Sequence, residues 1–236
     1  MILAELEIYH SRPIAPTRRI SLGMRNLPVE PAPGAGGLLL AAIVARSAPS
    51  VEPELRESLV TLIDELDHNG RVAQPRVRHR FQTDRVGLFR STHRLVADGN
   101  DLTFEFEDEY GKPVQQALGA IYATASLPMD ARTPIFDATR SALVWGRPVD
   151  DAFIAAVMGG GMASVDDLKS WNDPVAWALE ILDLEGSSDN TPSRRAVQRR
   201  FRDLLRSAHP DHGGVTDDAA ARIAELTEAR RILLAV

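Results

Sequence analysis

Apolar and polar residues alternate with a period of two near the start of the chain. A strand with one buried face has this pattern, so we predict a strand over Ile2–Tyr9. Its apolar face would carry Ile2, Ala4, Leu6 and Ile8. Arg19–Met24 alternates in the same way, and the two segments could pair as antiparallel strands across a proline-containing loop.

Longer segments with helical spacing of apolar residues follow. They predict helices over Ser50–Asp67, Pro113–Ala125, Pro134–Trp145 and Asp151–Met158. The apolar segment Gly37–Arg46 fits either a short buried helix or a strand, because its length does not distinguish them.

The turn sequence Asp98-Gly99 separates two alternating segments, His93–Ala97 and Leu102–Phe106. This arrangement predicts a β-hairpin. Strands and helices are therefore mixed in the first part of the chain, and we expect an α+β domain of unknown role over residues 1–162.

The rest of the chain, residues 163–236, carries helical patterns only. Gly159-Gly160-Gly161 follow a helix and have no lysine nearby, so they indicate a linker and not a phosphate-binding loop. Helices are predicted over Val165–Trp171, Val175–Leu184, Ser193–Ala208 and Thr216–Val236. The last two carry matched apolar stripes, which predicts an antiparallel helix hairpin in an all-α domain.

Composition narrows the class of protein. The 236 residues include no cysteine, which excludes disulfides and sites built on thiolates. The longest apolar run, Gly36–Ala45, is about half of the roughly 20 residues that a membrane-spanning helix needs. We expect a cytoplasmic protein that makes no membrane contact.

Charge is distributed unevenly. The net charge of the chain is −6, but residues 193–236 hold nine arginines against six acidic residues, a net charge of +3. Six of these arginines lie within Arg194–Arg206, against one aspartate. One strongly basic helix on an acidic protein points to a local acidic partner surface.

The basic helix is followed by His209-Pro210-Asp211 and then by two glycines. Proline disfavours helix at the residue before it and donates no backbone hydrogen bond. The helix must therefore end here, and we expect His209 and Asp211 at an exposed tip between two helices. The two histidines His209 and His212 have no third ligand fixed nearby, so we expect no metal site.

With these features together, residues from about Asp173 to Val236 resemble a J-domain, the co-chaperone module of DnaK-type (heat-shock-70 class) chaperones. His209-Pro210-Asp211 matches the signature loop of the family. Leu179–Leu184 resembles the first-helix pattern Tyr-x-x-Leu-Gly-Leu. The core positions of the next two family helices correspond to Val197, Phe201, Leu204, Ile223, Leu226, Ala229 and Leu233.

This chain departs from the family pattern at four positions. Leu179 and Asp183 replace the usual Tyr and Gly of the first helix. Ala208 stands where an aromatic residue often precedes the signature histidine, and Arg230 takes a position often held by Tyr. The signature itself is intact.

The resemblance implies a function. J-domains dock on a partner chaperone through a basic helix and the signature loop, and they stimulate its ATP hydrolysis. Carried over to this chain, the partner-binding residues would be Arg195, Arg199, Arg202, Arg206, His209, Pro210 and Asp211. We expect no cofactor and no catalytic activity in the chain itself, with residues 1–158 acting as an adaptor that selects a client protein or a location.

Two other functions stay open for the first domain. It could be an enzyme, although His10, His68, His79 and His93 form no recognised catalytic motif. We expect His79 and His93 to be solvated strand residues. It could instead bind nucleic acid through the basic stretch Arg71–Arg94, but the acidity of the domain argues against this.

Overall fold

The computed structural model describes residues 1–12, 18–68, 72–99, 101–107, 111–158, 168, 174–184, 192–208 and 216–235. The chain forms two compact units, Met1–Leu168 and Lys169–Val236. The predicted domain boundary at residues 162 and 163 and the predicted helix over Val165–Trp171 fall almost wholly outside the described residues, of which Leu168 is the one exception.

The first unit is built on a five-stranded sheet with the strand order β3-β2-β1-β4-β5. The strands are β1 (Ile2–His10), β2 (Arg18–Asn26), β3 (His79–Phe81), β4 (Phe89–Asp98) and β5 (Asp101–Phe106). β1 pairs antiparallel with β2 and β4, and β4 pairs antiparallel with β5. The predicted pairing of the first two strands and the predicted hairpin are both confirmed.

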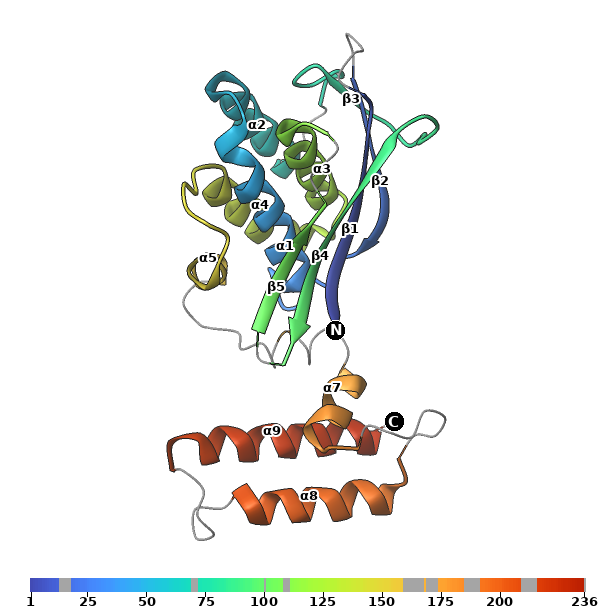
Figure 1. Cartoon of the computed structure of the whole chain (residues 1–236), viewed down its shortest axis with the longest axis vertical. Helices are drawn as coiled ribbons and strands as arrows, with labels where there is room; N and C mark the ends of the chain where they lie inside the picture. The colour runs from blue at the N-terminus through green and yellow to red at the C-terminus, as the bar shows by residue number, and fades with distance from the viewer. Residues whose placement is uncertain are drawn as a thin grey trace. The chain divides into compact units, whose positions relative to one another are not determined.

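Helices cover one face of this sheet (Figure 1). They are α1 (Gly34–Ser47), α2 (Pro53–Asp67), α3 (Pro113–Ala125), α4 (Met129–Leu143) and α5 (Asp151–Val157), with a short 3-10 turn at Ala48–Ser50. Strands and helices therefore alternate in one unit as the sequence patterns predict, and the chain as a whole is α+β.

The two faces of the sheet differ in chemistry. Ile8 points toward α3, where a Cβ atom on Gly119 would come within 2.6 Å of its side chain. Ala4, Leu6 and Ile8 of the predicted apolar face thus lie inside, but Ile2 is 46% exposed, and the pairing with β4 shifts register between Ile2 and Ala4. On the other face Glu7 pairs with Arg90 at 3.0 Å, and Glu5 pairs with Arg94 across the same two strands. A sheet with one face toward the core and one carrying charge has this alternation.

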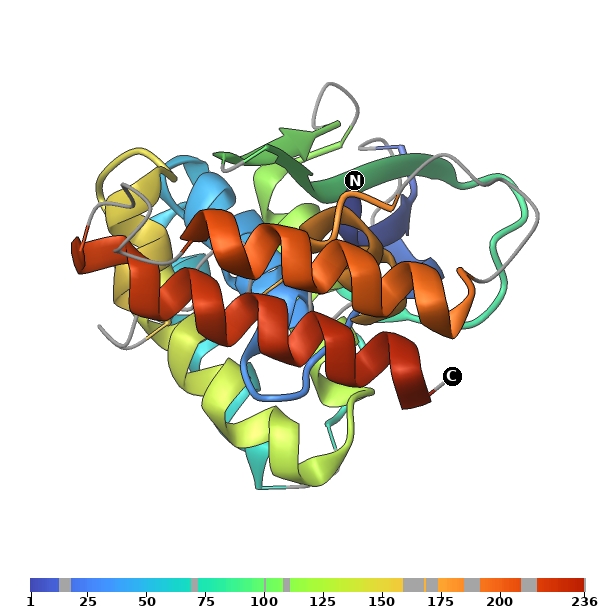
Figure 2. The same cartoon turned by 90° about the horizontal axis from the view of Figure 1, so that it is seen from below.

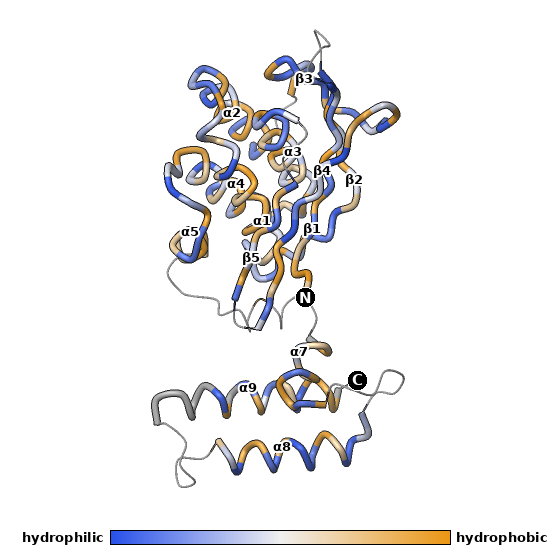
Figure 3. Tube along the Cα trace, viewed as in Figure 1, coloured by the Kyte–Doolittle hydropathy of each residue, from blue (hydrophilic) through white to orange (hydrophobic). Residues whose placement is uncertain are grey.

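α1 is the central helix of the first unit. Thirteen of its fourteen residues are buried, and the exception is Arg46. Figure 3 shows this apolar character along the tube of α1. A helix that is apolar on all sides has no periodic stripe, which explains why the sequence pattern of Gly37–Arg46 could not distinguish helix from strand.

Several predicted helix boundaries are wrong. α2 begins at Pro53 and not at Ser50, which belongs to the preceding 3-10 turn. α4 begins at Met129 and not at Pro134, which lies inside the helix. Proline lacks the amide hydrogen that bonds to the fourth preceding residue, so it is best tolerated near a helix start, and the prediction placed the start there. α7 (Pro174–Ile181) ends three residues earlier than predicted, for a reason given below.

The second unit contains α7, α8 (Arg194–Ala208) and α9 (Thr216–Ala235) among its described residues. α8 and α9 lie side by side in both orientations of the molecule (Figures 1 and 2). Across the described parts of both units, no helix combines the length and the apolar character that crossing a membrane requires.

The close approach of α1 to the preceding connector generates a prediction. A Cβ atom at Gly36 would lie 2.7 Å from the carbonyl carbon of Leu27 and 2.8 Å from its Cα. Backbone atoms cannot rotate away as a side chain can. We expect Gly36→Ala to lower the free energy of unfolding of the first unit by about 1–3 kcal/mol, measured by urea denaturation.

Gly146→Ala is the matched control, because a Cβ atom there meets nothing within 4 Å. A Gly36→Ala protein as stable as the control would show that the connector accommodates the added methyl group.

Candidate functional site

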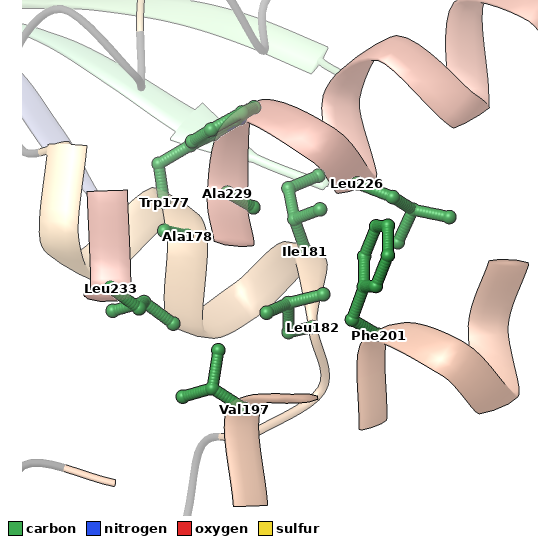
Figure 4. Packing of buried hydrophobic residues seen from close by; sticks show 9 residues of the cluster. All are labelled: Trp177, Ala178, Ile181, Leu182, Val197, Phe201, Leu226, Ala229 and Leu233. Atoms are coloured by element: carbon green, nitrogen blue, oxygen red, sulfur yellow. The ribbon is translucent and has the colours of Figure 1, made fainter. Parts of the chain in front are cut away.

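One apolar cluster holds the three helices of the second unit together. Its buried members come from α7, α8 and α9, and Figure 4 shows them in contact: Trp177, Ala178, Ile181, Leu182, Val197, Phe201, Leu226, Ala229 and Leu233. Most of the apolar stripe predicted for these helices lies in or against the cluster. Trp177 and Ala178 are additional members that the helix pattern did not single out.

The order of contacts across the cluster shows the direction of the two long helices. Phe201 lies beside Leu226, while Val197, one turn earlier in α8, lies toward Leu233 near the end of α9 (Figure 4). Residues earlier in α8 therefore face residues later in α9.

α7 ends in a hydrogen-bonded motif that reverses the chain. The amide of Leu184 donates to the carbonyl of Leu179, and the amide of Asp183 donates to the carbonyl of Glu180, both at 2.9 Å. Asp183 has φ = 50°, in the left-handed region. These two bonds and this conformation define a Schellman helix end, a position usually held by glycine. The motif explains why α7 stops before Leu184.

Arg200 of α8 holds this turn. Its Nε donates to the carbonyl of Leu182 at 3.2 Å, and its guanidinium pairs with the Asp183 carboxylate. The Arg200 side chain is about one third exposed. Arg200 is thus part of the framework between α7 and α8, although its sequence position lies within the basic run.

The four arginines predicted to meet a partner occupy a different side of α8. Arg195, Arg199, Arg202 and Arg206 are all exposed. At 3.6 residues per turn these positions lie within about 60° of one another around the helix axis, opposite Val197 and Phe201. We call these four residues the arginine stripe.

The arginine stripe has no counterions in the described part of the chain. None of its members forms an ion pair there, and the Nε of Arg202 donates only to the carbonyl of Gln198 at 3.2 Å. Like charges three or four residues apart destabilise a helix by about 0.2–0.5 kcal/mol per pair. The stripe therefore lowers the local stability of α8. Packing within the unit does not explain why four arginines occupy these positions.

The other predicted partner-binding residues, His209, Pro210 and Asp211, lie outside the described residues. They follow directly on Ala208, the last residue of α8, so the sequence places them at the end of the helix that carries the arginine stripe. Arg230 of α9 lies over the ring of Phe201, with its guanidinium carbon 4.4 Å from the ring centroid.

Carboxylates neutralise part of the second basic stretch, residues 71–94. Carboxylates of β1 and α2 neutralise three of its arginines: Arg76 pairs with Glu65, Arg90 with Glu7, and Arg94 with Glu5. Arg85 lies 5.2 Å from the centroid of the Tyr9 ring. A nucleic-acid site needs a basic patch free of carboxylates, and this arrangement does not supply one.

The expectation that His79 and His93 are solvated is wrong. Both are 1% exposed, and His10 is 2% exposed. His10 and His93 point to the inner face of the sheet because they share it with Leu6 and Ile8 in the register of β1 and β4. Alternation between the two faces of the sheet determines which side chains are buried here. The neighbouring arginines, which suggested solvent exposure, lie on the opposite face.

A chain of hydrogen bonds joins these buried polar side chains. His10 Nε2 lies 3.0 Å from Ser91 Oγ, Gln116 Nε2 donates to the same Oγ at 3.0 Å, and His93 Nε2 lies 3.0 Å from Gln116 Oε1. The Ser91 side chain is fully buried, so it meets no substrate in this conformation. Sequence reasoning missed this network, because its members come from three elements.

The environment of His79 perturbs its pKa. Burial lowers the pKa of His79, and the positive charges of Arg18 and Lys112 act in the same direction, while the hydrogen bond to the Val77 carbonyl opposes them. Among the residues that the structure describes, no group of three metal-binding side chains comes together.

Comparison of the chain with family models, with curated proteins and with solved structures found no match in any of the three.

The contrast between Arg200 and the arginine stripe gives a paired prediction. Arg200→Gln removes the bonds to the end of α7, and we expect it to lower the free energy of unfolding of the helical unit by about 1 kcal/mol, after allowing for solvent screening of the ion pair. Arg199→Gln should leave stability unchanged or raise it slightly. Hydrogen exchange in α7 and α8 measures both, and equal protection in the two variants would contradict the assignment.

The lowered pKa of His79 predicts a pH dependence. The unfolded chain takes up a proton near pH 6.5, whereas folded His79 resists it until lower pH. The first unit should therefore lose stability as the pH falls below about 6.5, by at most about 1.4 kcal/mol per pH unit for this group. Hydrogen exchange of the first unit at pH 7, 6 and 5 should show a shallower loss for His79→Asn than for wild type.

His68→Asn, at the exposed end of α2, is the control for this comparison. An unchanged pH slope in His79→Asn would show that His79 does not contribute.

Proposed function

We propose that this protein is a cytoplasmic co-chaperone that stimulates ATP hydrolysis by a DnaK-type chaperone. Residues 163–236 would act as an all-α J-domain with an antiparallel helix hairpin. Residues 1–162 would select the client protein or the location. The protein would have no enzymatic activity of its own.

The observation that carries this proposal is the arginine stripe. Arg195, Arg199, Arg202 and Arg206 lie on one side of α8, exposed and without ion pairs in the described residues. An arrangement that costs local stability is best explained by a partner, and four cations in line call for an acidic partner surface. His209-Pro210-Asp211 at the end of the same helix specifies which class of partner.

The end of α7 gives independent support. The family pattern has glycine at the position of Asp183, which fits a residue in the left-handed region. Asp183 adopts φ = 50° in this chain, and aspartate is one of the few other residues that tolerate that conformation. The departure in sequence thus preserves the backbone geometry, and Arg200 compensates by binding the aspartate.

Arg230 fits the same interpretation. The family often has Tyr at this position, and in this chain the guanidinium of Arg230 covers the ring of Phe201. A cation over an aromatic face contributes about 0.5–1 kcal/mol at an exposed site. The contact keeps the α8–α9 core covered where an aromatic ring would otherwise lie.

The two parts of the surface would act at different stages of binding. The arginine stripe would raise the association rate through long-range attraction, which salt weakens. Asp211 would form a desolvated charge pair with a cation of the chaperone, and His209 and Pro210 would shape its presentation. Charge pairs of this second kind determine the dissociation rate and specificity.

A direct test is single-turnover ATP hydrolysis by a DnaK-type chaperone with and without the full chain. Wild type should accelerate hydrolysis, whereas His209→Gln and Asp211→Asn should not. Loss of one partner of a desolvated charge pair costs about 2–5 kcal/mol, or about thirtyfold or more in affinity, so raising the protein concentration by only about threefold should not restore Asp211→Asn.

A double substitution, Arg199→Gln with Arg202→Gln, should raise the protein concentration needed for half-maximal acceleration but leave the maximal acceleration unchanged. Arg231→Gln removes an exposed arginine of α9 that already pairs with Glu228, and it serves as the control for lost charge. Equal acceleration by wild type, His209→Gln and Asp211→Asn would refute the proposal.

A further inference from the structure

A polar cavity of about 320 Å³ lies in the first unit, beside His79. It is formed where β2 begins, where the turn before β3 passes, and where α2 and α3 begin. Its charged or titratable lining residues are Arg18, Glu52, Glu54, Arg78, His79 and Lys112. Ligand sites commonly start at about 300 Å³, so the cavity suits a ligand of a few heavy atoms.

The cavity presents charges of both signs. Arg78 and Lys112 are exposed cations, and Glu52 and Glu54 are exposed carboxylates. No ion pair joins any of these four side chains within the described residues, although many other arginines of this unit are paired. Opposite charges that line one cavity without pairing with each other can bind two oppositely charged groups of one ligand.

His79 adds a buried hydrogen-bond acceptor. Its Nδ1 lies 2.6 Å from the Val77 carbonyl oxygen, so Nδ1 carries the hydrogen and Nε2 of the neutral ring carries the lone pair. Nε2 is buried and has no hydrogen-bond partner among the described residues. Buried acceptors are nearly always satisfied, and burial, with Arg18 and Lys112 nearby, disfavours protonation of the ring. The acceptor is therefore open to a donor that the described residues do not supply.

The backbone that carries His79 is held in an uncommon conformation. Val77 and Arg78 have φ values of 48° and 60°, in a region that a β-branched residue rarely adopts. Hydrogen bonds on both sides fix the turn, from Arg18 N to Arg78 O at 3.1 Å and from His79 N to Arg76 O at 2.7 Å. Strain of this kind persists where the surrounding structure over-determines it, and it clusters at ligand sites.

α3 contributes a positive helix end. Its first turn lines the cavity at Lys112, Pro113 and Val114. Gln115 fixes this end, because its Oε1 accepts from Lys112 N at 2.8 Å and its Nε2 donates to Ser11 O at 3.2 Å. The partial positive charge of a helix N-terminus adds to that of Lys112 and favours a carboxylate.

We propose that this cavity binds a small zwitterion of the α-amino-acid class. Lys112, Arg78 and the start of α3 would bind the carboxylate. Glu52 and Glu54 would bind the ammonium group, which also supplies the donor that His79 Nε2 needs. A purely anionic ligand would face two carboxylates and provide nothing for His79, and a purely cationic one would face the cations. This inference is independent of the proposed co-chaperone function.

Isothermal titration of the full chain with each of the twenty common α-amino acids tests the proposal. At least one should bind with saturation. The same amino acid with its amine acetylated, or with its carboxylate converted to an amide, should bind at least about tenfold more weakly, because each change removes a charge-assisted contact.

Matched substitutions locate the site. Lys112→Gln and Glu52→Gln should each weaken binding about tenfold, while Arg80→Gln and Glu57→Gln, which are exposed but do not line the cavity, should leave it unchanged. All four positions are on the surface, so the variants should fold. The proposal is overturned if no amino acid saturates the protein, if both blocked forms bind as well as the parent, or if the lining and control variants behave alike.

Discussion

The geometry of the second unit depends on which side of α8 is buried. Val197 and Phe201 pack against α9, and this contact fixes the rotation of the helix about its axis. With that rotation fixed, Arg195, Arg199, Arg202 and Arg206 must point away from the core. A single apolar stripe thus determines where all four cations are presented. A change that rotated α8 would bury arginines, which is far more costly than any loss of partner contacts.

Sequence reasoning succeeded for structural features that a single strand, turn or helix determines by itself. The alternation in β1, the turn at Asp98-Gly99 and the stripe of α8 are local patterns, and the residues carry them regardless of their neighbours. The location of the arginine stripe followed from the same periodicity. His209, Pro210 and Asp211 were identified by their order in the sequence, and this identification remains a prediction.

The sequence did not predict features that depend on contacts between different helices or strands. Arg200 looked like the other arginines of its run, because its bonds to Leu182 and Asp183 reach back 18 and 17 residues to the turn after α7. His10 and His93 continue the buried faces of their own strands, but the network that joins them through Ser91 and Gln116 needs two strands and a helix. The error at α4 has the opposite origin, because a local signal at Pro134 was followed although tertiary packing extends the helix past it.

The same distinction separates the structural arginines of this chain from those available to a partner. Arg76, Arg90, Arg94 and Arg200 each meet a carboxylate or a carbonyl, so each is explained by contacts within the chain. The arginine stripe forms no ion pair in the described residues, where its carbonyl contact is the bond from Arg202 to Gln198 of the same helix, although the net charge of −6 shows that carboxylates are abundant. Six acidic residues lie in residues 193–236, yet only Asp203 lies between Arg199 and Arg206. Neutralising the stripe would need only a few glutamates at neighbouring turns of α8. Asp203 lies one turn from Arg199 and from Arg206 but forms no ion pair with either in the described residues, so the positive charge on this face of α8 has no internal counterion there.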